Sequence, residues 1–375
     1  MRIAVPAETD PGETRVAASP ETVRKFIGLG ASVRVQSGAG TASGVRDEDF
    51  ATAGATIVHS AAETLADADI VLRVRRPSEL HGLKSGAAVI AIMDPHGHEA
   101  ALTALASAHV AAFAMELMPR ITRAQSMDVL SSQANLAGYR AVIDGASEYG
   151  RALPMMMTAA GTVPAARIFI MGVGVAGLQA IATARRLGAI VTATDVRPAT
   201  KEQVESLGAK FVAVEDDEFK QAETSGGYAK PMSAEYQAKQ AALVATHIAK
   251  QDIVITTALI PGRAAPRLVG AEMVKSMRAG SVLVDLAVER GGNVEGAKAG
   301  ETVDVDGVRI VGWSSPTRLA ASASALYAKN LFTFVETMID KKEKKIAINW
   351  DDELVKATCL TRDGAVVHPD FQRKA

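Results

Sequence analysis

The feature that most constrains this chain is a glycine-rich turn between two apolar strands, in the run IFIMGVGVAGLQAIATARRLGAIVTATD at 168–195. Gly172, Gly174 and Gly177 follow the first apolar run directly, and a helical pattern follows them. The order of strand, turn, helix and strand predicts a βαβ unit with parallel strands. In such a unit the first glycine permits the tight turn, the second leaves room for a pyrophosphate, and the third lets the helix pack closely on the sheet. Because the N-terminus of that helix attracts phosphate groups, the run predicts a dinucleotide site.

The acid at the end of the second strand indicates which dinucleotide is bound. Asp195 lies eighteen residues after Gly177, where a carboxylate accepts hydrogen bonds from the adenosine ribose hydroxyls. A 2′-phosphate would face that negative charge, so NAD(H) is favoured over NADP(H). Arg197 offers a positive charge for a 2′-phosphate, but the acid occupies the strand-end position. The predicted cofactor is therefore NAD(H).

Composition excludes several other classes of protein. The 375 residues suggest two or three domains, and 48% apolar residues with only 4% aromatic ones predict a core of aliphatic side chains and methionine. The net charge is −1, so no basic surface for nucleic acid is expected. Cys359 is the single cysteine, which excludes a disulfide framework or a cysteine-based metal cluster and favours a reducing, cytosolic setting.

No stretch is expected to cross a membrane or to direct export. The first ten residues, MRIAVPAETD, contain acids and a proline where a signal peptide has an apolar run. The uncharged run at 168–184 has 17 residues, fewer than the roughly 20 that a spanning helix needs. Its glycines fit a buried strand, turn and helix instead.

Short apolar strands alternate with helical segments through the first third of the chain. Strands are expected at 2–5, 31–36, 67–75, 87–93 and 109–115, and a helix at 19–30. Ser19 is suited to cap that helix, Pro20 to its first turn, and Gly28 and Gly30 to its end. This alternation predicts a parallel sheet with crossover helices, which extends to about residue 130.

A second unit of the same kind is expected around the glycine turn. A helix is predicted at 137–153, and further strands at 209–215, 252–259, 281–288 and 308–313. These strands are almost continuously apolar, as in sheets covered on both faces. The tail at 315–339 has apolar residues at helical spacing and is expected to pack back on the first unit, whereas 340–345, DKKEKK, is expected to form a solvated turn.

The predicted fold class is therefore α/β, with two Rossmann-like, doubly wound parallel-sheet domains and a cleft between them. Residues 1–130 with 316–375 would form the N-terminal domain, completed by the C-terminal helix, and residues 137–315 the NAD(H)-binding domain. No internal repeat or low-complexity linker is visible.

Ligands of open α/β sheets bind beyond the carboxyl ends of the strands. Thr257, Ala258 and Leu259 follow the strand DIVI, and Asp285 and Glu289 follow the next strand. Leu259 is expected to cover the adenine or a ribose. For Asp285, an equally good alternative is a carboxylate bonded to nearby backbone at the end of its strand.

The segment between the strands at 209–215 and 252–259 is longer than a tight crossover needs. Its first half, DDEFKQAETSGGYAKPM, is poor in apolar residues and contains Gly227 and Tyr228, whereas its second half, 233–250, has a helical pattern. Two interpretations of the first half stay open, a mobile lid over the nucleotide or a surface insertion.

A separate stretch, MELMPRITRAQSMDVLSSQANLAGYRAVIDGA at 115–146, sets polar residues in apolar surroundings. Together with MMMTAAGTVPAARIFIMGVGVAGLQAIATARRLGA, ATDVR and TTALIPG, it resembles the NAD(H)-binding component of the proton-translocating NAD(P) transhydrogenases. The resemblance covers essentially the whole chain. Because no membrane helix follows, we expect the three-chain bacterial arrangement, in which this component is a separate polypeptide.

The resemblance implies roles for individual residues. Arg120 and Asp128 are implied to hold the dihydronicotinamide, with Ser131 near its carboxamide, and Gln125 to reach toward the NADP(H)-binding component. The rest of NAD(H) is implied to be lined by Gly172, Gly174, Val175, Gly177, Asp195, Val196, Arg197, Gly227, Gln240, Ala258 and Leu259, with Tyr228 in the closing loop. From the residues alone, an alternative for Arg120 and Asp128 is a buried ion pair that fixes their loop.

The implied activity is direct hydride transfer between NAD(H) on this chain and NADP(H) on a partner, coupled to proton movement through a membrane component. Such a transfer moves no proton at the reacting carbons, so it needs the two rings to be positioned but no general acid or base. The implied partners are an NADP(H)-binding β subunit and a small membrane α subunit. The chain is expected to be a homodimer without bound metal, cytoplasmic and peripheral on the inner membrane through its partners.

Two other interpretations stay open. AETDPGETRVAASPETV and VLVDLAVERGG are also similar to alanine dehydrogenases, in which Arg15 would bind the substrate carboxylate. That family needs a Lys, a His and an Asp for imine chemistry. Here Arg75 stands in place of the Lys, His96 lies in MDPHGHE, and Glu289 stands in place of the Asp, and arginine is a poor proton donor at neutral pH. A non-catalytic NAD-binding sensor fits equally well, whereas HGHE at 96–99 is expected to be a surface turn rather than a metal site.

Overall fold

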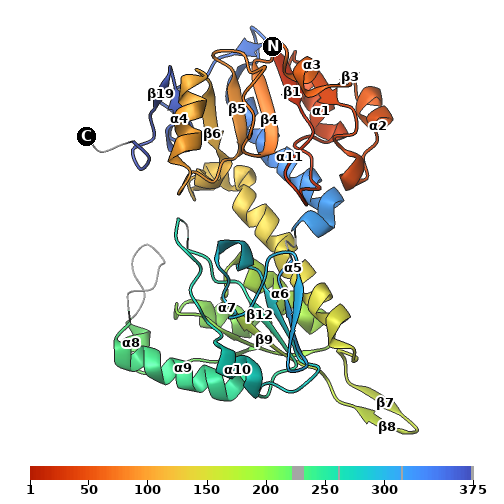
Figure 1. The fold of residues 1–375 in the computed structure, drawn as a ribbon, viewed down its shortest axis with the longest axis vertical. Coiled ribbons are helices and arrows are strands. Elements are labelled where there is room, and N and C mark those ends of the chain that lie inside the picture. The colour runs from red at the N-terminus through yellow and green to blue at the C-terminus, as the bar shows by residue number, and fades with distance from the viewer. Residues whose placement is uncertain (222–231, 261, 314–315, 373–375) are drawn as a thin grey trace. The chain divides into compact units, whose positions relative to one another are not determined.

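Two sheets, each dominated by parallel strands, organise the chain (Figure 1). The computed structural model describes residues 1–221, 232–260, 262–313 and 316–372. The chain divides into unit 1, which comprises Met1–Gln133 and Thr317–Ala375, and unit 2, Ala134–Pro316. The predicted α/β class with two parallel-dominated sheets is confirmed.

Unit 1 is built on an eight-stranded sheet with the order β19-β18-β6-β5-β4-β1-β2-β3. Its strands are β1 (Arg2–Val5), β2 (Ser32–Gln36), β3 (Thr56–Val58), β4 (Ile70–Arg75), β5 (Ala88–Ile92), β6 (Ala111–Ala114), β18 (Cys359–Arg362) and β19 (Ala365–Val366). Strands β1 to β6 pair in parallel, whereas β18 is antiparallel to β6 and β19 to β18. A strand is present at each of the five predicted places.

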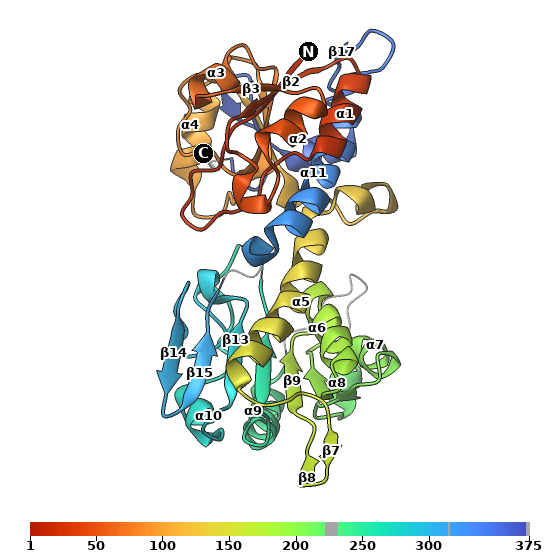
Figure 2. The same ribbon diagram turned by 90° about the vertical axis from the view of Figure 1, so that its right-hand side faces the viewer.

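Alternate residues of these strands contribute to two separate cores, one on each face of the sheet. Ile3 and Val5 of β1 belong to the larger core and Ala4, between them, to the smaller one, as expected for side chains that alternate across a strand. The helices on the larger core are α1 (Pro20–Gly28), α2 (Asp47–Thr52), α11 (Ala320–Glu336) and α12 (Glu353–Thr358), and those on the smaller are α3 (Ala61–Leu65) and α4 (Glu99–Ser107). Figure 2 shows α3 and α4 on the opposite side of this sheet from α1 and α11.

The first helix begins as its sequence predicts. Ser19 Oγ accepts a hydrogen bond from the Thr22 backbone N–H at 3.2 Å, and Thr22 Oγ1 accepts one from the Ser19 N–H at 2.9 Å. These two bonds form a capping box. Pro20 occupies the first turn, where its missing N–H leaves no helical bond unmade.

The C-terminal tail completes unit 1. Tyr327, Leu331 and Phe334 of α11 are fully buried in the larger core, which confirms that this helix packs on the first unit. The strands β16 (Ile339–Asp340) and β17 (Lys345–Ile346) flank the exposed turn expected at this place. The sequence pattern does not predict β18 and β19, because runs of four and two residues are too short to show an alternation.

Unit 2 has a seven-stranded sheet with the order β11-β10-β9-β12-β13-β15-β14. Its strands are β9 (Arg167–Met171), β10 (Ile190–Thr194), β11 (Lys210–Phe211), β12 (Ile253–Thr256), β13 (Val282–Asp285), β14 (Thr302–Val305) and β15 (Val308–Val311). All neighbours pair in parallel except β14 with β15. Strand β9 lies between β10 on one side and β12 on the other, so the chain changes direction across the sheet at β9. Ligands of open α/β sheets bind at such a switch point.

This second sheet is also covered on both faces. Ile168 and Ile170 of β9 face a core that includes residues of α5 (Val129–Tyr149), α6 (Val175–Arg186) and α7 (Thr200–Ser206). Phe169 and Met171 face a core that includes residues of α9 (Ala234–Ile248) and α10 (Ala271–Ser276). The shorter helices of the chain are η1 (Thr41–Ser43), η2 (Met115–Leu117), η3 (Thr122–Met127), α8 (Asp217–Lys220), η4 (Val288–Arg290) and η5 (Pro316–Leu319).

Several elements differ from the sequence-based expectations. Helix α5 begins at Val129 rather than 137, and β11 has two residues where a longer strand was expected. Unit 2 also contains strands that were not expected: the hairpin of β7 (Met156–Thr158) and β8 (Gly161–Val163), and the antiparallel edge strand β14. Each of these strands has only three or four residues, too few to show a clear alternation of apolar and polar residues.

Helices in the described part of the chain lack the combination of length and apolar character that crossing a membrane requires. Cys359 is a free, buried thiol. Burial raises its pKa to about 11, so the thiol stays protonated at neutral pH.

The packing of α5 on α6 depends on a glycine. A Cβ on Gly138 would lie 2.0 Å from the carbonyl oxygen of Ala176, a backbone atom that cannot turn aside. We expect Gly138→Ala to lower the free energy of unfolding by about 2 kcal/mol, because overpacking outweighs the better helix propensity of alanine. Thermal unfolding of the purified variant measures this loss.

Gly145→Ala, on the same helix, is the matched control. A Cβ there would lie 3.0 Å from a methyl group of Ile253, a side chain that can adjust. Its stability is expected to stay within about 1 kcal/mol of the wild type. Equal melting temperatures for the two variants would contradict the proposed backbone clash.

Candidate functional site

The glycine turn of unit 2 joins the end of β9 to the start of α6. Gly172 has φ +105°, and a Cβ there would lie 2.5 Å from Thr257 Oγ1. A Cβ on Gly177 would lie 1.9 Å from the carbonyl oxygen of Gly172. Both positions therefore require glycine for the fold itself. Gly172 requires it because of its positive φ, and Gly177 because of the close approach of the Gly172 carbonyl.

Gly174 is different, because no atom of the described residues, apart from its own chain neighbours, lies within 4 Å of the position of its Cβ. It is the N-cap residue of the twelve-residue helix α6 and has no side chain to accept a hydrogen bond from the first-turn N–H groups. Val175, the next residue, is 39% exposed. The start of α6 thus presents open space beside first-turn N–H groups that have no partner within the helix, an arrangement that suits a phosphate group.

Asp195 lies at the end of β10 and is tied to this turn. Its carboxylate accepts hydrogen bonds from the backbone N–H of Val173 at 2.7 Å and of Arg197 at 2.9 Å. The guanidinium of Arg197 also contacts it, with Nε at 2.9 Å and one terminal nitrogen at 3.0 Å. Arg197 therefore neutralises Asp195 in this structure, while Val196 between them is 59% exposed.

A second loop lies against the glycine turn. Thr257 Oγ1 donates a hydrogen bond to the carbonyl oxygen of Gly172 at 3.1 Å. The amide of Asn293 holds the next residue, Ala258, by accepting from its N–H at 3.0 Å and donating to its carbonyl at 2.9 Å. Leu259 follows and is 52% exposed. Thr257, Ala258 and the turn are thus brought together, as predicted for strand ends at a switch point.

The sequence interpretation missed Asn293. This residue is completely buried, and it also donates to the carbonyl oxygen of Pro266 at 2.8 Å. The signal available in the sequence was a polar residue directly after the pair Gly291 and Gly292. In the structure both glycines have a positive φ. A carboxamide fits this position because it can donate and accept at once.

Two predicted residues have partners within the protein. Gln240 accepts from the Val214 N–H at 2.9 Å and donates to Thr194 Oγ1 at 3.1 Å, so it links α9 to the end of β10. Asp285 is completely buried and accepts from the N–H groups of Ala287 at 2.8 Å and Val294 at 2.9 Å. For Asp285 the structural alternative is therefore confirmed.

The remaining predicted positions of unit 2 are Glu289, Gly227 and Tyr228. Glu289 is exposed on η4. Gly227 and Tyr228, with the predicted lid that contains them, lie outside the described residues.

The residues predicted to act at the nicotinamide lie in unit 1, on the loop 120–131 around η3. Arg120 and Gln125 are exposed, whereas Asp128 and Ser131 are half-buried. Asp128 accepts hydrogen bonds from the Ser131 N–H at 2.9 Å and from Ser131 Oγ at 2.5 Å. The bond to the backbone makes Asp128 the N-cap of α5, which explains why that helix begins at Val129.

The alternative of a buried ion pair between Arg120 and Asp128 is therefore wrong. Arg120 is exposed, and the Asp128 carboxylate is bonded to Ser131 instead. A charged group at a helix N-terminus is already stabilised by backbone N–H groups and needs no arginine partner.

A buried cluster of charges surrounds Arg15 in unit 1. Its guanidinium contacts Glu13 at 2.6 Å and donates to Gln133 Oε1 at 2.9 Å, and Arg75 Nε reaches the same Glu13 carboxylate at 2.9 Å. Burial opposes ionisation of Glu13, but the hydrogen bonds and charge of Arg15, with the charge of Arg75, hold its pKa below the usual value. Both arginines thus pair with one carboxylate of the protein itself, and the three groups together keep a net charge of +1.

Of the other residues considered for amino-acid chemistry, His96 and Arg75 lie in unit 1 and Glu289 lies in unit 2. His96 is exposed in a turn, as expected for HGHE, and its ring lies 4.9 Å from that of Phe371, centroid to centroid. Arg75 cannot replace a catalytic lysine as a proton donor at neutral pH.

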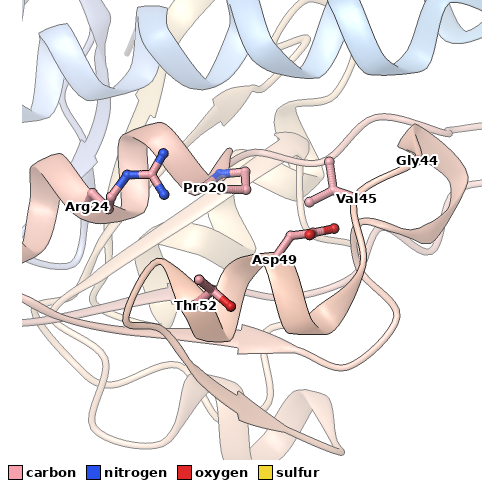
Figure 3. A pocket seen from close by; sticks show the side chains of 6 residues that line it. All are labelled: Pro20, Arg24, Gly44, Val45, Asp49 and Thr52. Atoms are coloured by element: carbon pink, nitrogen blue, oxygen red, sulfur yellow. The ribbon is translucent and has the colours of Figure 1, made fainter.

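An open hollow of about 330 Å³ lies between α1 and α2 in unit 1 (Figure 3). Its lining residues are Pro20, Arg24, Gly44, Val45, Asp49 and Thr52. None of them belongs to the predicted site, and Asp49 is already bonded to Arg46.

Comparison with known proteins agrees with this geometry. Residues 4–137 match the family description "Alanine dehydrogenase/PNT, N-terminal domain", and residues 141–369 match "Alanine dehydrogenase/PNT, C-terminal domain". An NAD(P) transhydrogenase subunit alpha polypeptide of Rhodospirillum rubrum is 55% identical over 377 residues, which cover 98% of each chain. The crystal structure of transhydrogenase from Sinorhizobium meliloti is 63% identical, with a TM-score of 0.90 over 98% of this chain and 100% of that one.

Alanine dehydrogenase is a more distant relative. The enzyme of Mycobacterium tuberculosis (strain ATCC 25618 / H37Rv) is 31% identical over 303 residues, which cover 80% of this chain and 75% of that one. The higher identity and coverage of the transhydrogenase subunits make this chain a component of a redox enzyme of their kind. The chain belongs to the alanine dehydrogenase/PNT family, within its group of NAD(P) transhydrogenase α subunits.

Proposed function

We propose that this chain is the NAD(H)-binding component of a proton-translocating transhydrogenase, in which hydride passes directly between NAD(H) here and NADP(H) on a partner. The observation that carries the proposal is the open start of α6 at Gly174, just after the switch-point strand β9 of unit 2. Open space beside unsatisfied N–H groups, at a switch point of an α/β sheet, is what a pyrophosphate needs.

The proposed NAD(H) site follows the carboxyl ends of β9, β10 and β12. Its residues would be Gly172, Gly174, Val175, Gly177, Asp195, Val196, Arg197, Gln240, Ala258 and Leu259. Asp195 would accept the ribose hydroxyls, and Arg197 would move aside or share the carboxylate. The exposed side chains of Val196 and Leu259 would cover the adenosine, because apolar groups line most ligand sites.

The loop 120–131 would act at the nicotinamide end. Arg120 and Asp128 would hold the dihydronicotinamide, with Ser131 near its carboxamide, and Gln125 would face the partner's nucleotide. The exposure of Arg120 and Gln125 supports roles directed outward. The bound nicotinamide supplies the hydride chemistry, and the protein's task is to fix its position, for which no acid–base pair is needed.

The partners that we propose are an NADP(H)-binding β subunit and a small membrane α subunit, which would carry the proton movement. The most similar relatives are named as one portion of a subunit alpha, which supports the existence of further subunits. We also propose a homodimer, held at the cytoplasmic face of the inner membrane through these partners. Residues 137–315 would be the NAD(H)-binding domain, and 1–130 with 316–375 the other domain.

An alanine dehydrogenase activity is the weaker candidate. The Glu13 carboxylate already pairs with both Arg15 and Arg75, so a substrate carboxylate would have to compete with it for their N–H groups. A non-catalytic NAD sensor would bind NADH but transfer no hydride to a partner-bound nucleotide, which separates it from the proposed function.

The first prediction concerns Gly174→Ala. Apart from its chain neighbours, no described residue has an atom within 4 Å of a methyl group at this position, and the backbone φ of −80° suits alanine. The melting temperature should therefore change by less than about 2 °C. The same methyl group would occupy the path of the pyrophosphate. We expect the NADH dissociation constant, measured by calorimetry, to rise by about 100-fold or more.

Gly177→Ala is the matched control for that variant. Its methyl group would meet the Gly172 carbonyl at 1.9 Å, so stability and NADH binding should both fall. Wild-type NADH affinity in Gly174→Ala would show that the pyrophosphate does not bind at this turn.

The second prediction concerns cofactor choice. We expect the wild type to bind NADH far more tightly than NADPH in equilibrium dialysis, because Asp195 repels a 2′-phosphate. Asp195→Ala should weaken NADH binding and narrow the preference for NADH over NADPH. The substitution removes the negative charge that pairs with Arg197 beside the proposed ribose position. Comparable affinities of the wild type for both cofactors would overturn the assignment of Asp195.

The third prediction separates Gln125 from Arg120. Gln125→Asn should leave NADH affinity nearly intact but slow single-turnover hydride transfer in the reconstituted complex, by about 100-fold, because it moves the amide by about 1 Å. Arg120→Ala should reduce both affinity and rate. If Gln125→Asn loses both in equal proportion, Gln125 is an ordinary cofactor contact; if it loses neither, the bridging role is wrong.

A further inference from the structure

The loop 120–131 is held to the rest of unit 1 by different contacts on its outer and inner sides. On the outside, Arg123 donates to both carboxylate oxygens of Asp352 at 2.8 and 2.9 Å and to Glu353 at 3.1 Å. On the inside, Ala124 and Met127 are buried in the larger core. These contacts fix η3 through its side chains, and the backbone on either side of Asp128 has a further contact.

That backbone is held by Asn330 of α11. Its Nδ2 donates to the carbonyl oxygen of Ser126 at 2.8 Å, and its Oδ1 accepts from Ser132 Oγ at 2.7 Å. Ser126 lies two residues before Asp128, and Ser132 four residues after it. One carboxamide therefore holds the chain on both sides of the Asp128–Ser131 pair.

We propose that Asn330 is a positioning residue for Asp128 and Ser131, by which the C-terminal tail sets the geometry of the nicotinamide end of the site. The proposal rests on the proposed function of that loop. Asn330 is 7% exposed, so water does not readily replace the bonds at its own end. Ser126 is exposed, so its carbonyl group would turn toward water once Asn330 no longer held it.

The chemistry of the carboxamide explains why no other side chain of this size serves here. Asparagine donates and accepts from one rigid plane, whereas aspartate of the same shape only accepts when ionised. Asn330→Asp would keep the bond from Ser132 and lose the bond to Ser126, where two oxygen atoms would then face each other. The substitution releases one side of the Asp128 turn without removing volume from the core.

Ser324→Ala is the matched control. Ser324 lies on the same helix, is 2% exposed, and accepts a hydrogen bond from the Val16 N–H at 3.0 Å. The variant loses a buried hydrogen bond of similar kind, but at the start of the chain rather than at the loop. Any general loss of stability in unit 1 should appear in both variants.

The experiment compares full-length wild type, Asn330→Asp and Ser324→Ala. In the protein alone, amide hydrogen exchange in a peptide covering 122–133 should accelerate about 10-fold in Asn330→Asp and remain unchanged in Ser324→Ala, because only the former opens the loop locally. With the NADP(H)-binding component, single-turnover hydride transfer should slow by about 10- to 100-fold in Asn330→Asp alone. The NADH dissociation constants of both variants should stay within about 2-fold of the wild-type value, a difference that corresponds to little binding free energy.

Equal exchange or equal rates in the two variants would overturn the positioning role, since the effect would then be general stability. An Asn330→Asp protein with wild-type exchange and rate would overturn it as well. If the wild type itself transfers no hydride in the complex, the proposed function fails, whereas the exchange measurement on the protein alone still decides whether Asn330 holds the loop.

Discussion

The close approach of α6 to the backbone around it is the constraint on which unit 2 depends. A Cβ on Gly177 would meet the carbonyl of Gly172 at 1.9 Å, and one on Gly138 would meet the carbonyl of Ala176 at 2.0 Å. The first turn of α6 is therefore enclosed by backbone from the glycine turn on one side and from α5 on the other. Backbone atoms cannot rotate away as side chains do, so the start of this helix is fixed in place. A helix start fixed in this way keeps its N–H groups aimed at one point, which is the preorganised arrangement that anion binding requires.

Much of the fold could be predicted because its main elements have continuous local patterns. The strands β1, β4, β5, β9, β12 and β13 are apolar on both faces, and α11 shows its buried face as Tyr327, Leu331 and Phe334 at helical spacing. The elements that could not be predicted take their stability from distant partners. Strand β18 exists because it pairs with β6, some 245 residues earlier in the chain, and its own four residues contain little that distinguishes them from a loop. The early start of α5 depends on one side chain, Asp128, which a pattern of apolar residues does not register.

The candidate site could be predicted in part for the same reason. The glycine spacing and the strand-end acid have a local signature, and the resemblance supplied roles for the loop 120–131 that spacing alone does not provide. Asn293 and Asn330 escaped the sequence interpretation, because each acts on backbone that is far away along the chain. A carboxamide that supports a loop looks in sequence like any other polar residue. Asp195 and Gln240, which the sequence predicts as cofactor contacts, also accept hydrogen bonds from backbone N–H groups and so support the protein's own loops.

The three glycines of the turn are retained for different reasons, and this has a consequence for how the sequence can drift. Gly172 and Gly177 are required by folding, so selection for a stable protein alone would preserve them. At Gly174 no described residue other than its chain neighbours would meet a Cβ, so the proposed phosphate is the reason to keep its side chain absent. A descendant that gave up its nucleotide but kept its fold would therefore lose Gly174 first, while the other two glycines persisted. Within these six residues, position 174 would therefore report whether nucleotide binding has been kept, whereas positions 172 and 177 report whether the fold has been kept.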